Sequence, residues 1–221
     1  MSYDGLLLDF DGVVVEVLED EKRIPAFRSQ FEQLLTGDGV TLDGQVIDAL
    51  AHSVTPDRVR SFSDRSGLPP EQLWRYRDDA FAELFQTVAG NGDKDPFDDV
   101  TALDGVDVPL GIASNNQRRI VESLVTEYDL GEYFGSIRAR EPTLESLDRK
   151  KPEPVFLEQA IADLAVENPL YVGDKETDIL AGQRTGIDTA LIRREHNADR
   201  AIGTDPTYEV HGLEEVVALL D

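Results

Sequence analysis

Residues 6–12 read LLLDFDG and are the clearest indication of the fold in this sequence. Three leucines form a short apolar run that Gly12 closes, which is typical of a buried strand followed by a turn. Alternate residues of a strand point to the same side, so Asp9 and Asp11 are expected to converge where the strand ends. The stretch therefore predicts a first strand that brings two carboxylates to one edge of a sheet.

Similar apolar runs, each followed by a helical pattern, recur in the second half of the chain. Strands that alternate with helices indicate a parallel sheet that is covered on both faces. The predicted fold class is therefore α/β, with a doubly wound parallel sheet. Further strands are expected at residues 109–114, 135–138, 170–172, 189–192 and 208–210, and helices at 154–164, 178–185 and 213–220. Another helix is expected after Asn115 and Asn116, which would cap it.

Residues 17–95 interrupt this alternation, because they show helical patterns alone. The patterns cover residues 25–35, 43–52, 56–65 and 70–88. A helical block between the first and second strands is best explained as an inserted domain. We therefore predict an α/β core made of residues 1–16 and 96–221, and a helical domain made of residues 17–95.

Four groups of polar residues lie at predicted strand ends or helix starts. Open α/β sheets bind ligands at the carboxyl ends of their strands, so these groups are expected to share one site. They are Asp9 with Asp11, Ser114 with Asn115, Lys151 before Pro152, and Asp174 with Asp178 after Gly173.

The order of these groups resembles the four motifs of the haloacid dehalogenase superfamily. The resemblance covers residues 6–192 and is clearest in KKPEPVF at 150–156 and GDKETDILAGQRTG at 173–186. The helical insert resembles the cap of the phosphoglycolate phosphatase-like branch. The resemblance implies a Rossmann-like core and a magnesium-dependent phosphatase. The substrate would be a small phosphorylated metabolite, with phosphoglycolate or a sugar phosphate as candidates.

The resemblance also implies roles for individual residues. Asp9 would attack phosphorus and become an aspartyl phosphate. Asp11 would protonate the leaving oxygen and then take a proton from the hydrolytic water. Ser114, Asn115 and Lys151 would bind the phosphoryl group, and Lys151 would also neutralise part of its charge.

A Mg²⁺ site of oxygen ligands follows from the same resemblance, and such ligands suit this hard cation. Asp9, the backbone carbonyl of Asp11 and Asp174 would hold the ion. Asp178 would bind it through water or orient Lys151. The chain contains no cysteine, which excludes thiolate metal sites and cysteine catalysis.

Alternatives to this interpretation stay open. A phosphomutase would use the same residues, a haloacid dehalogenase would lack the acid at Asp11, and a phospho-accepting receiver domain would have no room for the insert. Lys150 could replace Lys151, although the position beside Pro152 favours Lys151, and Ser114 could be a helix cap. Substrate choice is expected to rest on the helical domain, whose arginines are equally typical of solvated helix faces: Arg23, Arg58, Arg65 and Arg75. The histidines, which show no metal-ligand spacing and are expected to be structural or exposed, are His52, His196 and His211.

The chain is strongly acidic, with 45 Asp and Glu residues against 21 Lys and Arg residues and a formal net charge of −24. This charge disfavours nucleic acid and anionic membrane surfaces as partners. The N-terminus lacks the pattern of a signal peptide, and no apolar run is long enough to span a membrane, so a cytoplasmic location is expected. An acidic, lysine-poor composition is typical of proteins from salt-rich cytoplasm and predicts a halophilic protein.

We expect salt to stabilise this protein. Repulsion among the excess carboxylates destabilises the fold at low ionic strength, and dissolved ions screen it. The thermal unfolding midpoint should therefore rise with KCl into the molar range, as measured by circular dichroism. The screening length is already about 3 Å at 1 M, so any further rise would come from ion binding or stronger apolar burial. A midpoint that does not respond to salt would contradict the halophilic interpretation.

Overall fold

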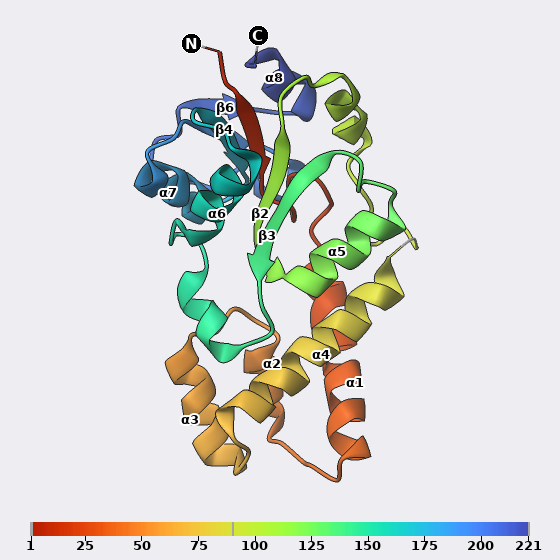
Figure 1. The fold of residues 1–221 in the computed structure, drawn as a ribbon. Helices are drawn as coiled ribbons and strands as arrows, with labels where there is room; N and C mark the ends of the chain where they lie inside the picture. Colours follow the sequence, from red (N-terminus) through yellow and green to blue (C-terminus); the bar gives the residue numbers. More distant parts are fainter. Residues whose placement is uncertain (1, 90, 221) are drawn as a thin grey trace.

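The structure, a computed structural model, describes residues 2–89 and 91–220. Within these residues, six strands form one parallel sheet in the order β3-β2-β1-β4-β5-β6 (Figure 1). The strands are β1 (Gly5–Leu8), β2 (Leu110–Gln117), β3 (Phe134–Arg140), β4 (Pro169–Gly173), β5 (Thr189–Ile192) and β6 (Tyr208–Val210). The predicted parallel sheet is confirmed, and β1 lies at its centre because its leucines are buried on both faces.

Different helices cover the two faces of the sheet. They are α5 (Arg118–Glu127), α6 (Val155–Leu164), α7 (Glu176–Thr185) and α8 (Leu213–Ala218). Leu7 of β1 packs with Phe156 of α6 and Ala181 of α7 on one face. Leu6 and Leu8 belong to the cluster on the other face, which includes apolar side chains of α5 and α8. The period of two along β1 therefore produces the doubly wound arrangement.

The described residues between β1 and β2 include four α-helices that lie together at the end of the molecule opposite both termini (Figure 1). They are α1 (Asp20–Gly37), α2 (Gly44–Leu50), α3 (Pro56–Ser66) and α4 (Pro70–Val88). Stacked rings join α1 to α4, with the ring centroids of Phe27 and Phe81 4.4 Å apart. None of the described helices is long and apolar enough to cross a bilayer.

Three 3₁₀ helices complete the chain: η1 (Asp98–Gly105), η2 (Leu144–Arg149) and η3 (Glu195–Asn197). η2 contacts α3 and α4, so the loop after β3 also touches the helical block. The expected cap at Asn115 and Asn116 is wrong, because β2 continues to Gln117 and α5 begins at Arg118. The side-chain oxygens that a cap would use accept other N–H groups, that of Lys151 at Asn115 and that of Gln117 at Asn116.

A buried ion pair joins the helical block to the sheet. Asp78 of α4 is fully buried and accepts two hydrogen bonds from the guanidinium of Arg140 at the end of β3, both at 2.8 Å. Arg77 also contacts Asp78, at 3.3 Å. Both guanidinium groups lie over Trp74, at 4.5 and 5.1 Å from the ring centroid. One carboxylate therefore compensates two arginines in a region shielded from water.

We expect Asp78→Asn to destabilise the fold strongly, because it leaves two arginines without their carboxylate. Removing one partner of a buried ion pair costs about 3–5 kcal/mol. The matched control is Asp79→Asn, the same change one residue along, where the pair with Arg119 is half-exposed. That change should cost about 0–1 kcal/mol. Urea unfolding followed by fluorescence measures the free energy of unfolding of both variants. Equal losses of stability would contradict the conclusion that the Asp78 ion pair joins the helical block to the sheet.

Candidate active site

The ends of three neighbouring strands bring the predicted residues together. β1 pairs with β2 on one side and with β4 on the other, so that Leu8 lies opposite Ile112 and Val172. The polar residues that follow these positions, and that therefore share one edge of the sheet, are Asp9, Ser114 and Asp174.

Lys151 is the centre of the polar network at this edge. Its ammonium lies 2.9 Å from Oδ1 of Asp9 and 2.7 Å from Oδ1 of Asp178. It also donates to the Tyr171 hydroxyl at 2.7 Å and to the Ala113 carbonyl at 2.9 Å. The Lys151 side chain is only 1% exposed, and a buried charge needs such partners because leaving water is costly. These contacts fix Lys151 beside both carboxylates.

The two oxygens of Asp9 have different surroundings. Oδ1 contacts Lys151 and accepts the backbone N–H of Phe10 at 2.8 Å. Oδ2 has no hydrogen-bond partner in the part of the chain that the structure describes. Burial raises the pKa of Asp9 to about 6; the ammonium of Lys151 opposes this rise, and the like charges of Asp178 and Asp174 add to it. One oxygen of Asp9 is thus held in place while the other is available to a reaction partner.

Asn115 fixes the loop that carries Lys151. Its side-chain oxygen accepts the Lys151 N–H at 2.7 Å, and its amide nitrogen donates to the Lys151 carbonyl at 3.1 Å. Ser114 is buried, and its hydroxyl oxygen accepts the N–H of Asn116 at 3.2 Å. Neither residue caps α5, whose N-cap position is occupied by Gln117.

The Asp11 carboxylate has other partners than the Asp9 carboxylate, so the structure shows no shared contact between the two acids that were expected to converge. One carboxylate oxygen forms an ion pair with Lys94, and the other accepts a hydrogen bond from the Asn116 amide at 2.9 Å. Burial alone would raise the pKa of Asp11, but the charge and hydrogen bond of Lys94, with Lys175 and Asn116, hold it below its ordinary value. Lys94 is buried and also donates to the Glu16 carbonyl at 2.9 Å. Asp11 is therefore held as a carboxylate in this structure.

Asp174 lies between two basic side chains. Oδ1 is 2.8 Å from the Lys175 ammonium, and Oδ2 is 2.8 Å from Nε2 of His196. Burial favours a higher pKa for Asp174, but the hydrogen bond to His196 and the charge of Lys175 bring it below its ordinary value. His196 was expected to be structural or exposed, and the structure places its ring in contact with Asp174, because η3 lies against the end of β4.

Two glycines allow the acidic residues to approach. A Cβ atom on Gly173 would lie 2.1 Å from Cβ of Asp178, so only glycine fits between β4 and the start of α7. Gly12 has a φ of +89°, and a Cβ there would lie 2.5 Å from Oδ2 of Asp174. Gly12 was predicted to close the first strand in a turn, and both glycines provide close packing at the site.

Three of the predicted metal ligands come together. Asp9, Asp174 and Asp178 are buried, and each offers an oxygen atom within 4.8 Å of the others. The Asp11 side chain is not part of this group among the described residues. Hard divalent cations such as Mg²⁺ prefer carboxylate and carbonyl oxygens at about 2.1 Å, so the donor set and its excess negative charge fit this ion.

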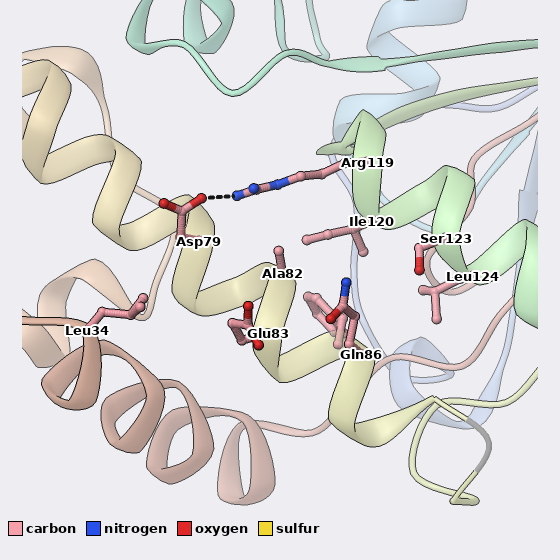
Figure 2. A pocket seen from close by; sticks show the side chains of 10 residues that line it. Leu34, Asp79, Ala82, Glu83, Gln86, Arg119, Ile120, Ser123 and Leu124 are labelled. Atoms are coloured by element: carbon pink, nitrogen blue, oxygen red, sulfur yellow. Dashed lines mark hydrogen bonds and ion pairs between the residues drawn. The ribbon is translucent and has the colours of Figure 1, made fainter. Parts of the chain in front are cut away.

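A cavity of about 370 Å³ lies next to this edge. Asp11, Asn116 and Lys175 line it from the sheet side, and Arg23 and Arg77 line it from the helical block. A second hollow of about 250 Å³ lies between α1, α4 and α5, where Asp79 and Arg119 pair (Figure 2). No predicted site residue lines the second hollow among the described residues, so the first is the candidate substrate site.

Sequence reasoning missed several residues of this network. They are Lys94, Asn116, Tyr171, Lys175 and His196. One available signal was the scarcity of lysine, because four of the five lysines in the chain lie at the network or its cavity. Nothing comparable marks Tyr171 or His196, whose roles depend on how distant segments meet.

Comparison with known proteins agrees with this geometry. The model of the haloacid dehalogenase-like hydrolase family matches residues 6–192. Phosphoglycolate phosphatase 1 from Pseudomonas aeruginosa is 29% identical over 117 residues, which are 52% of this chain and only 42% of that enzyme. Pyrophosphatase PpaX from Anoxybacillus flavithermus is 25% identical over 236 aligned residues, covering 100% of this chain and 98% of the relative.

The structure of CbbY from Rhodobacter sphaeroides in complex with phosphate has the same fold. It superposes with a TM-score of 0.69 at 18% identity and covers 99% of both chains. The family match extends from the first strand to the fifth and includes the sheet edge where the acidic residues meet. The chain therefore belongs to the haloacid dehalogenase-like hydrolase family.

Proposed function

We propose that this chain is a magnesium-dependent phosphatase that hydrolyses a small phosphate monoester through an aspartyl phosphate on Asp9. The observation that carries the proposal is the position of Lys151, which lies between Asp9 and Asp178 beside a buried group of oxygen ligands. An anionic phosphoryl group approaching Asp9 needs positive charge, which Lys151 and a bound cation would supply. Two curated relatives are named as phosphatases of small phosphate compounds, which supports the same reaction class.

In the first step, the free oxygen of Asp9 attacks phosphorus, and the bond from phosphorus to the leaving oxygen breaks. Lys151 and the hydroxyl of Ser114 hold the phosphoryl oxygens. Asp9, Asp174 and Asp178, with the backbone carbonyl of Asp11, would hold Mg²⁺, which supplies charge neutralisation when bound. Asp178 also orients Lys151 directly, because their charged atoms are 2.7 Å apart.

Asp11 is proposed to move the protons. It gives one to the leaving oxygen, and in the second step it takes one from the water that attacks phosphorus, while the bond from phosphorus to Asp9 breaks and the Asp9 carboxylate is released. The ion pair with Lys94 favours the carboxylate that the second step needs. The first step needs the protonated form, and a dianionic phosphoryl group near Asp11 would raise its pKa by charge repulsion.

Residues 17–95 are proposed to be the cap that encloses the substrate. Their helices supply one wall of the cavity of about 370 Å³, which suits a small phosphorylated metabolite. We propose phosphoglycolate or a sugar phosphate as the substrate. A phosphomutase would return the phosphoryl group to a sugar, and product analysis after reaction in water would separate it from a phosphatase.

The metal requirement is tested by chelation. EDTA should abolish hydrolysis of p-nitrophenyl phosphate, and Mg²⁺ added in excess should restore it, because all of the proposed ligands are oxygens. Release of nitrophenolate is measured by absorbance at constant ionic strength. Full activity in EDTA would refute the metal assignment.

Substitutions of the two acidic residues of the first motif should impair different steps of the reaction. Asp9→Asn removes the nucleophile and should prevent phosphoenzyme formation with any substrate. Asp11→Asn should nearly stop the first step with an alkyl phosphate, whose leaving group needs a proton. Nitrophenolate leaves without that help, while the second step still lacks its base. Asp11→Asn should therefore give a burst of nitrophenolate near one equivalent per site.

Rapid-quench labelling and the burst assay measure these outcomes on the same protein samples. Wild-type protein is the reference, and its phosphoenzyme should turn over rather than accumulate. Phosphoryl labelling of Asp9→Asn would show that another residue is the nucleophile. Wild-type turnover of an alkyl phosphate by Asp11→Asn would remove Asp11 from proton transfer.

A further inference from the structure

The candidate substrate cavity is cationic although the protein is not. Six of the 21 lysine and arginine residues line it, against two carboxylates, Asp11 and Asp20. The six are Arg23, Arg77, Lys94, Arg140, Lys150 and Lys175. In a chain with a net charge of −24, such a concentration of positive charge calls for a specific cause.

Five of these six side chains already have a carboxylate partner. Arg23 pairs with Asp20, Lys94 with Asp11 and Lys175 with Asp174, while Arg77 and Arg140 share Asp78. Lys150 has no carboxylate within ion-pair distance among the described residues, and its hydrogen-bond partner is the Ser53 hydroxyl at 3.4 Å. Lys150 is therefore the cation of this cavity whose charge is not paired with a carboxylate of the described residues.

The side chains of Lys150 and Lys151 point in different directions. The φ and ψ of Lys150 are −65° and 145°, in the polyproline II region, where the chain has about three residues per turn. Lys151 points into the sheet edge toward Asp9, and Lys150 points toward the loop after α2 that carries Ser53. The adjacent lysines thus reach different places: Lys151 reaches the buried network at Asp9, and Lys150 lines the cavity.

The surroundings of Lys150 carry excess positive charge. Arg77 and Arg140 lie near it with Asp78 as their shared carboxylate, so the group of three cations and one anion has a net charge of +2. Burial, together with the charges of Arg77 and Arg140, lowers the pKa of Lys150 to about 8. The ammonium form is costly in such a place, and a bound anion would offset that cost.

We propose that Lys150, with Ser53 and the nearby charge of Arg77, binds a second anionic group of the substrate. The substrate is then a phosphate monoester with a carboxylate or a second phosphate at its other end. The same cavity is lined by Lys150 and Ser53 and, on the sheet side, by Asp11 and Lys175, whose neighbours in the chain or in space belong to the acidic group at Asp9. This inference rests on the proposed phosphatase function, which places the reacting phosphoryl group at Asp9.

The test compares ligands of matched size in the background of Asp9→Asn, which prevents turnover. The ligands are 2-phosphoglycolate, ethane-1,2-diol bisphosphate and 2-hydroxyethyl phosphate, and calorimetry with Mg²⁺ measures each dissociation constant. The second anionic group is a carboxylate in 2-phosphoglycolate and a phosphate in ethane-1,2-diol bisphosphate, whereas 2-hydroxyethyl phosphate has no second anionic group. At least one doubly anionic ligand should bind about 10- to 100-fold more tightly than 2-hydroxyethyl phosphate, the range expected for a charged hydrogen-bond partner.

Lys150→Met should remove this preference, with the ratio of the two dissociation constants falling toward one. Lys22→Met is the matched control, because Lys22 is exposed, pairs with Asp93 and does not line the cavity. The control should leave the ratio unchanged. In otherwise wild-type protein, Lys150→Met should raise KM for the doubly anionic substrate more than it lowers kcat.

The outcomes separate a failure of the proposed subsite from a failure of the proposed phosphatase function. Equal binding of all three ligands, or a preference that survives Lys150→Met, would overturn the subsite. Absence of metal-dependent hydrolysis of p-nitrophenyl phosphate by the wild-type protein would instead overturn the proposed function, whatever the binding ratios are. Circular dichroism of each variant identifies a change caused by loss of folding.

Discussion

The site depends on one buried ammonium held between two buried carboxylates. Lys151 contacts Asp9 and Asp178, and each of the three charges would be costly without the others. Other features of the sequence provide this arrangement: Asn115 holds the lysine loop, and Gly173 lets Asp178 approach the strand end. The same constraint leaves one oxygen of Asp9 without a hydrogen-bond partner among the described residues, beside the carboxylates of Asp174 and Asp178, which is where the proposed chemistry begins.

The helical block is joined to the sheet by charges rather than by apolar contacts alone. Asp78 binds Arg140 across the joint, and Lys94 binds Asp11 from the segment that returns from α4 to the core. Asp11, the proposed general acid and base, therefore contacts the segment that follows α4. A change in the position of that segment would alter the surroundings of Asp11.

The cavity and the rest of the protein carry opposite charges. A strongly acidic chain repels small anions at long range, and dense salt screens that repulsion within a few ångströms, about 3 Å at 1 M. Inside the cavity, buried cations act at short range, where screening by salt is weak. An anionic substrate could thus be bound locally by a protein whose overall charge opposes its approach.

Much of the fold was predictable from local patterns, because strand burial, helical periodicity and strand-end polar residues are encoded in short stretches. LLLDFDG defined β1 and its two acids, and the helical pattern at 70–88 matches α4. The end of β2 was not predictable, since Asn115 and Asn116 bind Lys151 and Asp11, partners that are distant in sequence. The contacts of Lys94, His196 and Lys150 likewise required the tertiary structure. Local sequence patterns are enough to predict which residue types reach the sheet edge. Which of the charged side chains pair with one another, and that Lys150 has no carboxylate partner among the described residues, depend on how distant segments pack.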